Sequence, residues 1–235
     1  MKYLLSLAII FVWLMAGAQS TDAKKAKQDS IPWEMRKNAF IYSMAKQYND
    51  PAVARMALYN LIAETPGNPA IYDTLALWYY EYNQLASAAL IAQDAMKLNP
   101  NDLFAAEIAA ISFEGLGVKN KAVQNYEKLY LGNNDINMLY KIAFLQMDLK
   151  RYGEAINNAD IIIESPKSES EKLLFPIDDK QNSQEIPLKV AAIRLKGMIE
   201  ADRGNTSLAK ELYQKALDMK PDFVVLKNQI ADLNK

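Results

Sequence analysis

The side chains that most often carry chemistry are scarce in this chain. It contains no His and no Cys, which excludes Ser-His-Asp and Cys-His catalysis, thiolate metal sites and disulfides. The stretch Gly115-Leu116-Gly117 lacks the following glycine and lies between two expected helices, so it does not match a phosphate-binding loop. The sequence therefore predicts a protein that is not an enzyme and that binds no cofactor.

Carboxylates are the remaining candidates for chemistry. Asp178 and Asp179, together with Glu169 and Glu171, could hold a hard cation through oxygen ligands. Their spacing matches no calcium-binding loop, and a solvated acidic loop explains them more simply. We assign no metal ligand. A glycan- or metal-binding protein, or an enzyme that uses these loop carboxylates, stays as the weaker alternative.

Residues 1–18 have the pattern of a secretory signal. Lys2 precedes an apolar run of about 12 residues, 4–15, and Ala16-Gly17-Ala18 offers the small residues that a signal peptidase reads. The run is shorter than the roughly 20 residues that a membrane span needs, although an uncleaved anchor is the alternative. We expect cleavage between Ala18 and Gln19, a secreted and periplasmic bacterial protein, and no transmembrane segment in the mature chain.

The charge of the mature chain is close to balanced. Removing Lys2 leaves 26 basic residues from the 27 in the whole chain, against 28 acidic ones. This balance argues against nucleic acid as the partner, because such proteins present a basic surface. The polar stretch 19–31 is expected to be a flexible linker.

A stretch at residues 69–100 predicts two amphipathic helices joined by a turn at 82–84. The same pattern recurs with a period of 34 residues, once shortened by one residue and once lengthened by a 20-residue insertion. A fixed period of this size with two helices in each unit is typical of a solenoid. The small residues that mark the period are Ala54, Ala88, Ala122, Ala155 and Ala209.

The residues at these repeated positions resemble those of the tetratricopeptide repeat (TPR) family, over roughly 35–223. The resemblance implies an all-α, right-handed solenoid of about five helix-turn-helix repeats with a C-terminal capping helix. Departures from the pattern occur at Asn38, Asn134, Lys167 and Lys196. The best-matching unit carries the pattern on Gly197, Gly204, Ala209, Tyr213, Ala216 and Pro221.

The expected organisation follows from the repeat pattern. The signal peptide (1–18) and the linker (19–31) precede a solenoid over 32–235. Its parts are repeats at about 32–66, 69–100, 101–134, 135–166 and 188–221, an insertion at 167–187, and a capping helix at 222–235.

The resemblance also implies a binding surface. In TPR proteins the concave groove is lined by the first helix of each unit, and aromatic and Met side chains in a groove are what peptides or helices dock against. We therefore expect a non-catalytic protein–protein interaction scaffold in the cell envelope, which binds a peptide or protein partner in this groove. The groove candidates are Asp73, Leu77, Tyr80, Glu81, Phe104, Glu107, Ile111, Glu114, Tyr140, Phe144, Met147, Asp148, Arg194, Met198 and Asp202.

The insertion at 167–187 is the second candidate surface, with Leu174, Phe175 and Ile177 as its contact residues. Long insertions in solenoids are often functional. Its FPIDD and EIPL segments could pair as a small hairpin, or Leu174 and Phe175 could simply cover a gap between the fourth and fifth units. The corresponding alternative function is a structural subunit of an envelope assembly that is bound through this insertion. The sequence predicts neither the identity of the partner nor the oligomeric state.

Overall fold

The computed structural model describes residues 31–177 and 182–233 of the 235-residue chain. The expected signal peptide, nearly all of the linker, and Asp178 and Asp179 lie outside the described residues. The described chain forms two compact units, 31–67 and 68–233, and each unit is described on its own.

The first unit is a helical hairpin of α3 (Trp33–Gln47) and α4 (Pro51–Glu64). Asp50 caps α4, because its side chain accepts a hydrogen bond from the Val53 N–H at 3.1 Å. Asn38, which departs from the repeat pattern, is buried and accepts a 3.2 Å hydrogen bond from the Asn60 side chain. The polar residue is therefore tolerated because it has a polar partner.

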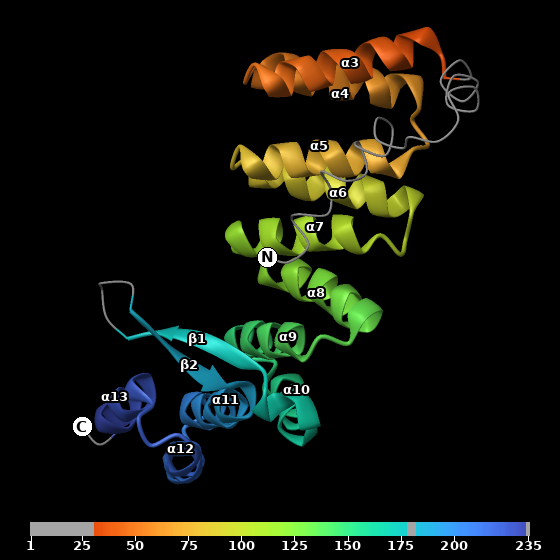
Figure 1. Ribbon diagram of the computed structural model, residues 1–235. Coiled ribbons are helices and arrows are strands. Elements are labelled where there is room, and N and C mark those ends of the chain that lie inside the picture. The colour runs from red at the N-terminus through yellow and green to blue at the C-terminus, as the bar shows by residue number, and fades with distance from the viewer. Residues whose placement is uncertain (1–30, 178–181, 234–235) are drawn as a thin grey trace. The chain divides into compact units, whose positions relative to one another are not determined.

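The second unit continues the helix-turn-helix pattern (Figure 1). Four helix pairs follow one another, a β-hairpin stands before the last pair, and a single helix ends the described chain. The elements are α5 (Pro69–Glu81), α6 (Leu85–Leu98), α7 (Leu103–Gly115), α8 (Lys119–Asn133), α9 (Ile136–Asp148), α10 (Tyr152–Glu164), a 3₁₀ turn η1 (Pro166–Glu169), β1 (Lys172–Pro176), β2 (Ser183–Pro187), α11 (Leu188–Asp202), α12 (Thr206–Met219) and α13 (Val224–Leu233).

The turn inside each helix pair has the same backbone geometry. One residue adopts positive φ, and the next N–H donates to the carbonyl five residues earlier, as from Gln84 to Tyr79 at 2.8 Å. This is a Schellman cap, which satisfies carbonyls left over at the end of a helix. The positive-φ residues keep the repeat spacing, and they are Asn49, Asn83, Gly117, Lys150 and Gly204.

The interior of each helix pair confirms that the small residues lie where its two helices approach each other. All five alanines that mark the period are at most 1% exposed, because the two helices of a pair approach each other there. At Gly197 the approach is closer still, since an added Cβ would lie 2.4 Å from the Tyr213 ring. Tyr79, Tyr126 and Tyr213 are buried, as core residues should be.

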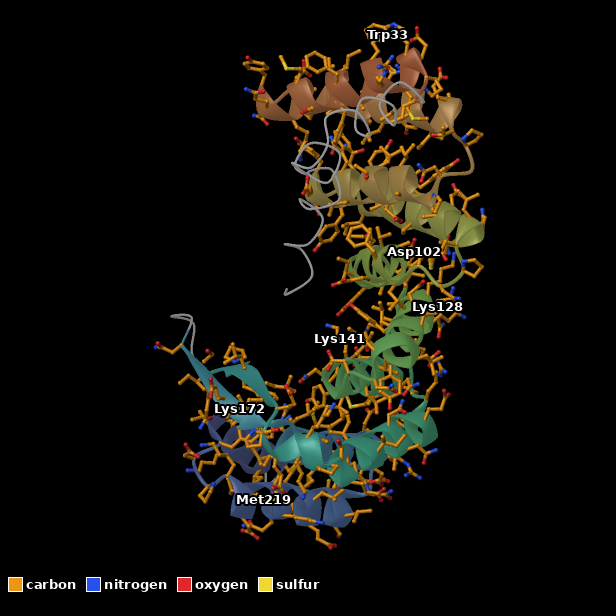
Figure 2. All side chains as sticks on the ribbon, turned by 45° about the vertical axis from the view of Figure 1, so that its right-hand side comes forward. Trp33, Asp102, Lys128, Lys141, Lys172 and Met219 are labelled. Carbon is orange, nitrogen blue, oxygen red and sulfur yellow. The ribbon has the colours of Figure 1, made fainter. Side chains whose placement is uncertain are left out.

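The first helices of neighbouring pairs gather on one side of the second unit. Helix α5 contacts α7, and α9 contacts α11, whereas within the described chain the second helices make no mutual contacts of similar extent. Figure 2 shows the two sides, with Lys141 of α9 on one and Lys128 of α8 on the other. We call the side formed by α5, α7, α9 and α11 the first-helix face.

The insertion folds into an antiparallel hairpin that packs on α11 (Figure 1). Leu173 and Phe175 lie on its packed face with Ile186, in a cluster that includes Phe223. The hairpin expectation is confirmed, but the strap expectation is wrong for Leu174, because Leu173 and Phe175 alternate with it and leave it 69% exposed. Strand β1 pairs through 172–176, which is shifted from the FPIDD segment.

The hairpin is also tied to the last helix. The Gln184 side chain donates to the Asp222 carbonyl oxygen at 2.8 Å and accepts from the Val224 N–H at 3.2 Å. Phe223 and Leu226 are fully buried, so α13 covers the apolar end of the last helix pair, as predicted for a capping helix.

Candidate partner-binding face

The structure sorts the fifteen groove candidates by burial and by partners. Asp73, Met147 and Arg194 are at most 9% exposed. Their expected place on an open groove surface is therefore wrong, because each is enclosed by its neighbours. They cannot contact a partner without a rearrangement.

Arg194 lies beneath the hairpin. Its guanidinium is 5.2 Å from the Phe175 ring centroid and 5.9 Å from that of Phe223, and its Nε donates to Gln229 at 2.6 Å. Such stacking on aromatic faces stabilises a guanidinium. Three further candidates, Tyr140, Met198 and Phe144, pack against the apolar clusters around α11.

Two acidic candidates instead connect neighbouring helix pairs. Lys119 at the start of α8 forms a 2.6 Å ion pair with Asp148 at the end of α9. One helix pair later, the hydroxyl of Tyr152 at the start of α10 donates to Asp202 at the end of α11, in the equivalent position. Asp148 and Asp202 therefore have a structural explanation that does not need a partner.

Glu114 at the end of α7 is also engaged. It accepts a 2.7 Å hydrogen bond from the Tyr126 hydroxyl and forms a 2.6 Å ion pair with Lys141. Burial, followed by the Glu114 hydrogen bond and charge, raises the pKa of Tyr126 above its usual value, so this phenol stays protonated and donating.

Six candidates remain, and all of them lie on α5 and α7. None of the six is fully buried, and Glu81 is exposed. They combine aliphatic, aromatic and acidic groups on two helices in mutual contact, which gives a partner both apolar area and charge. We call this surface the α5–α7 patch, and it consists of Leu77, Tyr80, Glu81, Phe104, Glu107 and Ile111.

Asp73 lies on the same helix as three residues of the patch, as a buried carboxyl. Its pKa is raised to about 7 by burial, then by the charge of Asp102 and a hydrogen bond with it. Its Oδ1 atom is buried and has no hydrogen-bond partner in the described chain. Asp102 itself caps α7 through the Phe104 and Ala105 N–H groups, both at 3.1 Å.

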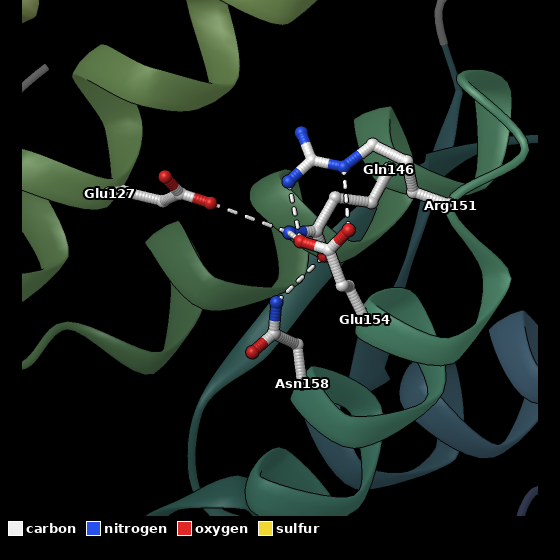
Figure 3. Close-up of polar contacts among 5 residues, drawn as sticks. All are labelled: Glu127, Gln146, Arg151, Glu154 and Asn158. Carbon is white, nitrogen blue, oxygen red and sulfur yellow. Dashed lines mark hydrogen bonds and ion pairs between the residues drawn. The ribbon is translucent and has the colours of Figure 1, made fainter.

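A polar network between α8, α9 and α10 is the other concentration of functional groups (Figure 3). The buried Gln146 side chain accepts from Asn158 at 2.7 Å and donates to Glu127 at 3.4 Å. Arg151 pairs with Glu154 beside it. Because both ends of the amide have hydrogen-bond partners, the polar Gln146 is tolerated at the position that Tyr79 and Phe113 occupy in the two preceding helix pairs.

The insertion candidates differ in exposure. Leu174 and Ile177 are 69% and 39% exposed, whereas Phe175 packs against Phe223. In the described chain, no group of three or more carboxylates is placed to hold a metal ion. Within the same residues, no helix has the length and apolar character that crossing a bilayer requires.

Sequence reasoning missed several of these features. The burial of Arg194 under Phe175 and the joints at Asp148 and Asp202 depend on residues that are 19 to 50 positions apart. The 34-residue spacing of Asn49, Asn83 and Gly117 was a signal for the common turn geometry, and it could have been found from the sequence alone.

Comparison with known proteins supports the fold but identifies no sequence family. No family model matches the chain, and no curated protein matches it. Among solved structures, a tetratricopeptide repeat protein from Parabacteroides merdae has a TM-score of 0.58 at 19% identity and covers 86% of this chain and 73% of its own. YrrB, described as a TPR protein with an unusual peptide-binding site, has a TM-score of 0.60 at 13% identity, with 91% and 98% covered.

MamA has a TM-score of 0.56 at 15% identity and covers 79% of this chain and 91% of its own. At these identities the likeness concerns the backbone arrangement, and it agrees with the helix pairs, the turns and the repeat spacing described above. The chain therefore has the tetratricopeptide repeat fold.

Proposed function

We propose that the protein is a non-catalytic interaction scaffold of the cell envelope, which binds a peptide or protein partner on the first-helix face of α5 and α7. The observation that carries this proposal is the α5–α7 patch. Its six side chains all keep exposed area, whereas the other nine candidates are buried, packed against apolar clusters, or paired across neighbouring helix pairs. Peptide binding by a protein of similar fold, YrrB, supports the same class of function.

The test uses affinity capture from an envelope extract with two versions of the full chain. One is the wild type, and the other carries Phe104→Ser and Ile111→Ser. We expect a partner that the wild type retains and the variant loses, because large apolar side chains supply most of the binding energy of such surfaces. Circular dichroism and the melting temperature must first show that the variant is folded.

A matched control carries the same change on the second helices. Leu90 of α6 and Leu131 of α8 are 60% and 77% exposed, so Leu90→Ser with Leu131→Ser removes similar apolar surface elsewhere. Retention by this control, with loss by the α5–α7 variant, places binding on the patch. Loss by neither variant contradicts the proposal.

The envelope location rests on the N-terminal sequence pattern alone. It predicts that the exported protein begins at Gln19. N-terminal sequencing of the protein from a periplasmic fraction checks this, and an intact Met1 in the mature protein would contradict it.

A second candidate function is a structural subunit of an envelope assembly that is bound through the hairpin. The exposed Leu174, which stands on the outer face of β1, favours it. Leu174→Ser should leave the packed face intact. Loss of the captured partner with this variant, and not with the α5–α7 variant, would move the binding site to the hairpin.

A further inference from the structure

Large apolar side chains lie exposed along one side of α3, the first helix of the unit at 31–67. Trp33, Phe40 and Tyr48 are 64%, 63% and 70% exposed, and the half-buried Met44 lies between the last two at helical spacing. With about 200 Å² for a whole aromatic side chain, the three rings leave on the order of 400 Å² in water. Exposed apolar area of this size on one element usually marks an interaction surface. We call these four residues the α3 stripe.

The repeat register shows what such a stripe packs against elsewhere in the chain. Counted back from the positive-φ residue of each turn, Phe40 and Met44 correspond to Leu195 and Ile199 of α11. Those two are fully buried, in one cluster with Ala155 of α10, the second helix of the preceding pair. Within the described residues no second helix precedes α3. The α3 stripe is therefore a helix-packing surface that stays exposed in the described chain.

A hollow of about 270 Å³ opens beside the stripe, between the end of α3 and the start of α4. This volume is below the roughly 300–1,000 Å³ of small-molecule pockets, so the hollow suits one large side chain. Trp33 is such a side chain, and it stands at the opposite end of the same helix (Figure 2). The face thus carries both a projecting group and a hollow. The residues that line the hollow are Phe40, Ile41, Met44, Ala45, Tyr48, Asp50 and Val53.

The charges beside the stripe are compensated within the chain. Lys37 forms a 2.7 Å ion pair with Glu34, and the Arg36 guanidinium lies 5.9 Å from the centroid of the Trp33 ring. A second copy of this face would therefore add apolar contact without opposing unpaired like charges. The stretch 19–30, which precedes α3 in the expected mature chain, contains no apolar side chain larger than alanine, so it has little with which to cover the stripe.

We propose that the α3 stripe is the interface of a two-fold homodimer, in which the α3 helices of two copies run antiparallel and cross near Phe40. A two-fold interface must be self-complementary, with residue i of one copy on residue j of the other and the reverse. Trp33 and Gln47 lie seven residues on either side of Phe40, so Trp33 of each copy reaches the hollow of the other.

The exposed area agrees with a dimer of ordinary size. The three aromatic rings supply about half of the roughly 800 Å² that each partner buries in a standard interface, and Met44, Val53 and the surrounding polar groups add to it. This surface is separate from the α5–α7 patch, so the homodimer does not depend on the proposed function.

Sedimentation equilibrium of the full chain, expressed from Met1 and purified as the cell processes it, tests the proposal over about 1–100 µM. We expect a dimer. Phe40→Ser/Met44→Ser and, separately, Trp33→Ala should each weaken the association by at least about tenfold, because large apolar side chains at the centre of an interface carry most of its binding energy. Circular dichroism and the melting temperature show whether the variants are folded. The exposed Trp33 keeps the test decisive if the double variant does not fold.

Two controls show whether the effect is confined to the stripe. Leu90→Ser/Leu131→Ser removes exposed apolar side chains from α6 and α8, and it should dimerise as the wild type does. Phe104→Ser/Ile111→Ser should also dimerise, although it should lose the captured partner. A dimer that depends on the stripe, beside capture that does not depend on Phe104 and Ile111, would support the homodimer while the proposed function fails.

Disulfide cross-linking tests the antiparallel arrangement, because the chain has no Cys of its own. A mixture of Trp33→Cys and Tyr48→Cys chains should form a cross-linked dimer on oxidation. Either variant alone should not, since the two copies of position 33 would lie about 21 Å apart along the helices, at about 1.5 Å per residue, well beyond the roughly 7 Å limit between the Cα atoms of a disulfide.

Three results would overturn the homodimer. They are a monomeric wild type over the whole concentration range, an association that Phe40→Ser/Met44→Ser and Trp33→Ala leave unchanged, and oxidation of the mixture without a cross-link between positions 33 and 48. If the monomer also retains the apolar run 4–15 by mass spectrometry, the chain's own N-terminal segment replaces the second copy as the occupant of the stripe.

Discussion

One position recurs in the turns of all five described helix pairs, and three residue types occupy it. Asn and Gly adopt positive φ at low cost, and they account for four of the turns. In the fourth pair the residue is Lys150, with φ of 59°. A Cβ-bearing residue without a short polar side chain is strained in this region, so Lys150 is the weak point among the turns.

Lys150→Gly should therefore stabilise the protein by about 1 kcal/mol, because glycine relieves the Cβ strain. The measurement is the free energy of unfolding from urea denaturation. Gly117→Ala is the reciprocal change at the equivalent turn, where φ is 73° and no atom crowds the added Cβ. It should cost about 1 kcal/mol, and an unchanged stability in both variants would show that the turns carry no strain.

A second effect at the residue scale concerns Asp73. Its folded-state pKa of about 7 lies above the ordinary value of 3.8, so the folded state holds the proton more tightly than the unfolded chain. Stability from this group is therefore fully present below pH 4 and is lost as the pH rises toward 7. The Asp73 carboxyl thus opposes folding above neutral pH.

Asp73→Asn should remove this loss, because the amide is neutral at every pH and can still donate to Asp102. At pH 8 we expect the variant to be more stable than the wild type by about 2–4 kcal/mol, with no gain at pH 4. Urea denaturation across pH 4–8 measures it. Asp218→Asn, on the exposed surface of α12, serves as the control. An equal pH dependence of stability in Asp73→Asn and in the wild type would refute the raised pKa of Asp73.

At the scale of elements, one contact between neighbouring helix pairs recurs along the chain with different chemistry. The start of a second helix meets the end of the next first helix through Leu85 and Gly115, then Lys119 and Asp148, then Tyr152 and Asp202. The contact changes from apolar to ionic to a hydrogen bond while its place in the repeat is kept. Geometry is therefore conserved along the solenoid by position rather than by residue type.

The hairpin is the element that departs from the repeat, and its two faces have separate roles. Phe175 faces Phe223 and the Arg194 guanidinium, whereas its neighbour Leu174 points away. Pro176 and Pro187 occupy non-hydrogen-bonded pairs of the hairpin, so their backbone nitrogens point toward the free edges of the two strands. Since proline has no N–H, these residues limit pairing of the edges with other strands. The hairpin is thus built to pack inward.

Substitutions on the two faces of β1 should separate these roles. Phe175→Ala should destabilise the protein by about 2–4 kcal/mol, because it removes a large aromatic side chain from the cluster over α11 and α13. Leu174→Ala on the opposite face should change the stability by less than about 0.5 kcal/mol. Thermal or urea unfolding measures both, and equal losses would mean that Leu174 also packs against the fold.

At the scale of the whole molecule, the sequence predicted the helix pairs, the insertion and the capping helix, because the 34-residue period depends on local packing and turn chemistry. The placement of the site was less predictable. A groove-facing position on a repeat was inferred equally for Glu107 and Arg194, yet only Arg194 is covered by the hairpin. That difference depends on an insertion outside the repeat, which the periodic pattern does not describe.

The same reasoning separates the two compact units by stability. In the unit at 31–67, the buried large apolar side chains are Leu58 and Leu61, beside three alanines and Asn38. The unit at 68–233 buries many more large side chains, among them Ile108, Ile142 and Leu195.

Because burial of apolar area supplies most of the folding free energy, we expect the amide hydrogens of α3 and α4 to exchange through openings of lower free energy than those of α7 and α11. Native-state hydrogen exchange resolved by peptide measures this directly, and equal protection of the four helices would show that the small interior of 31–67 does not set its stability.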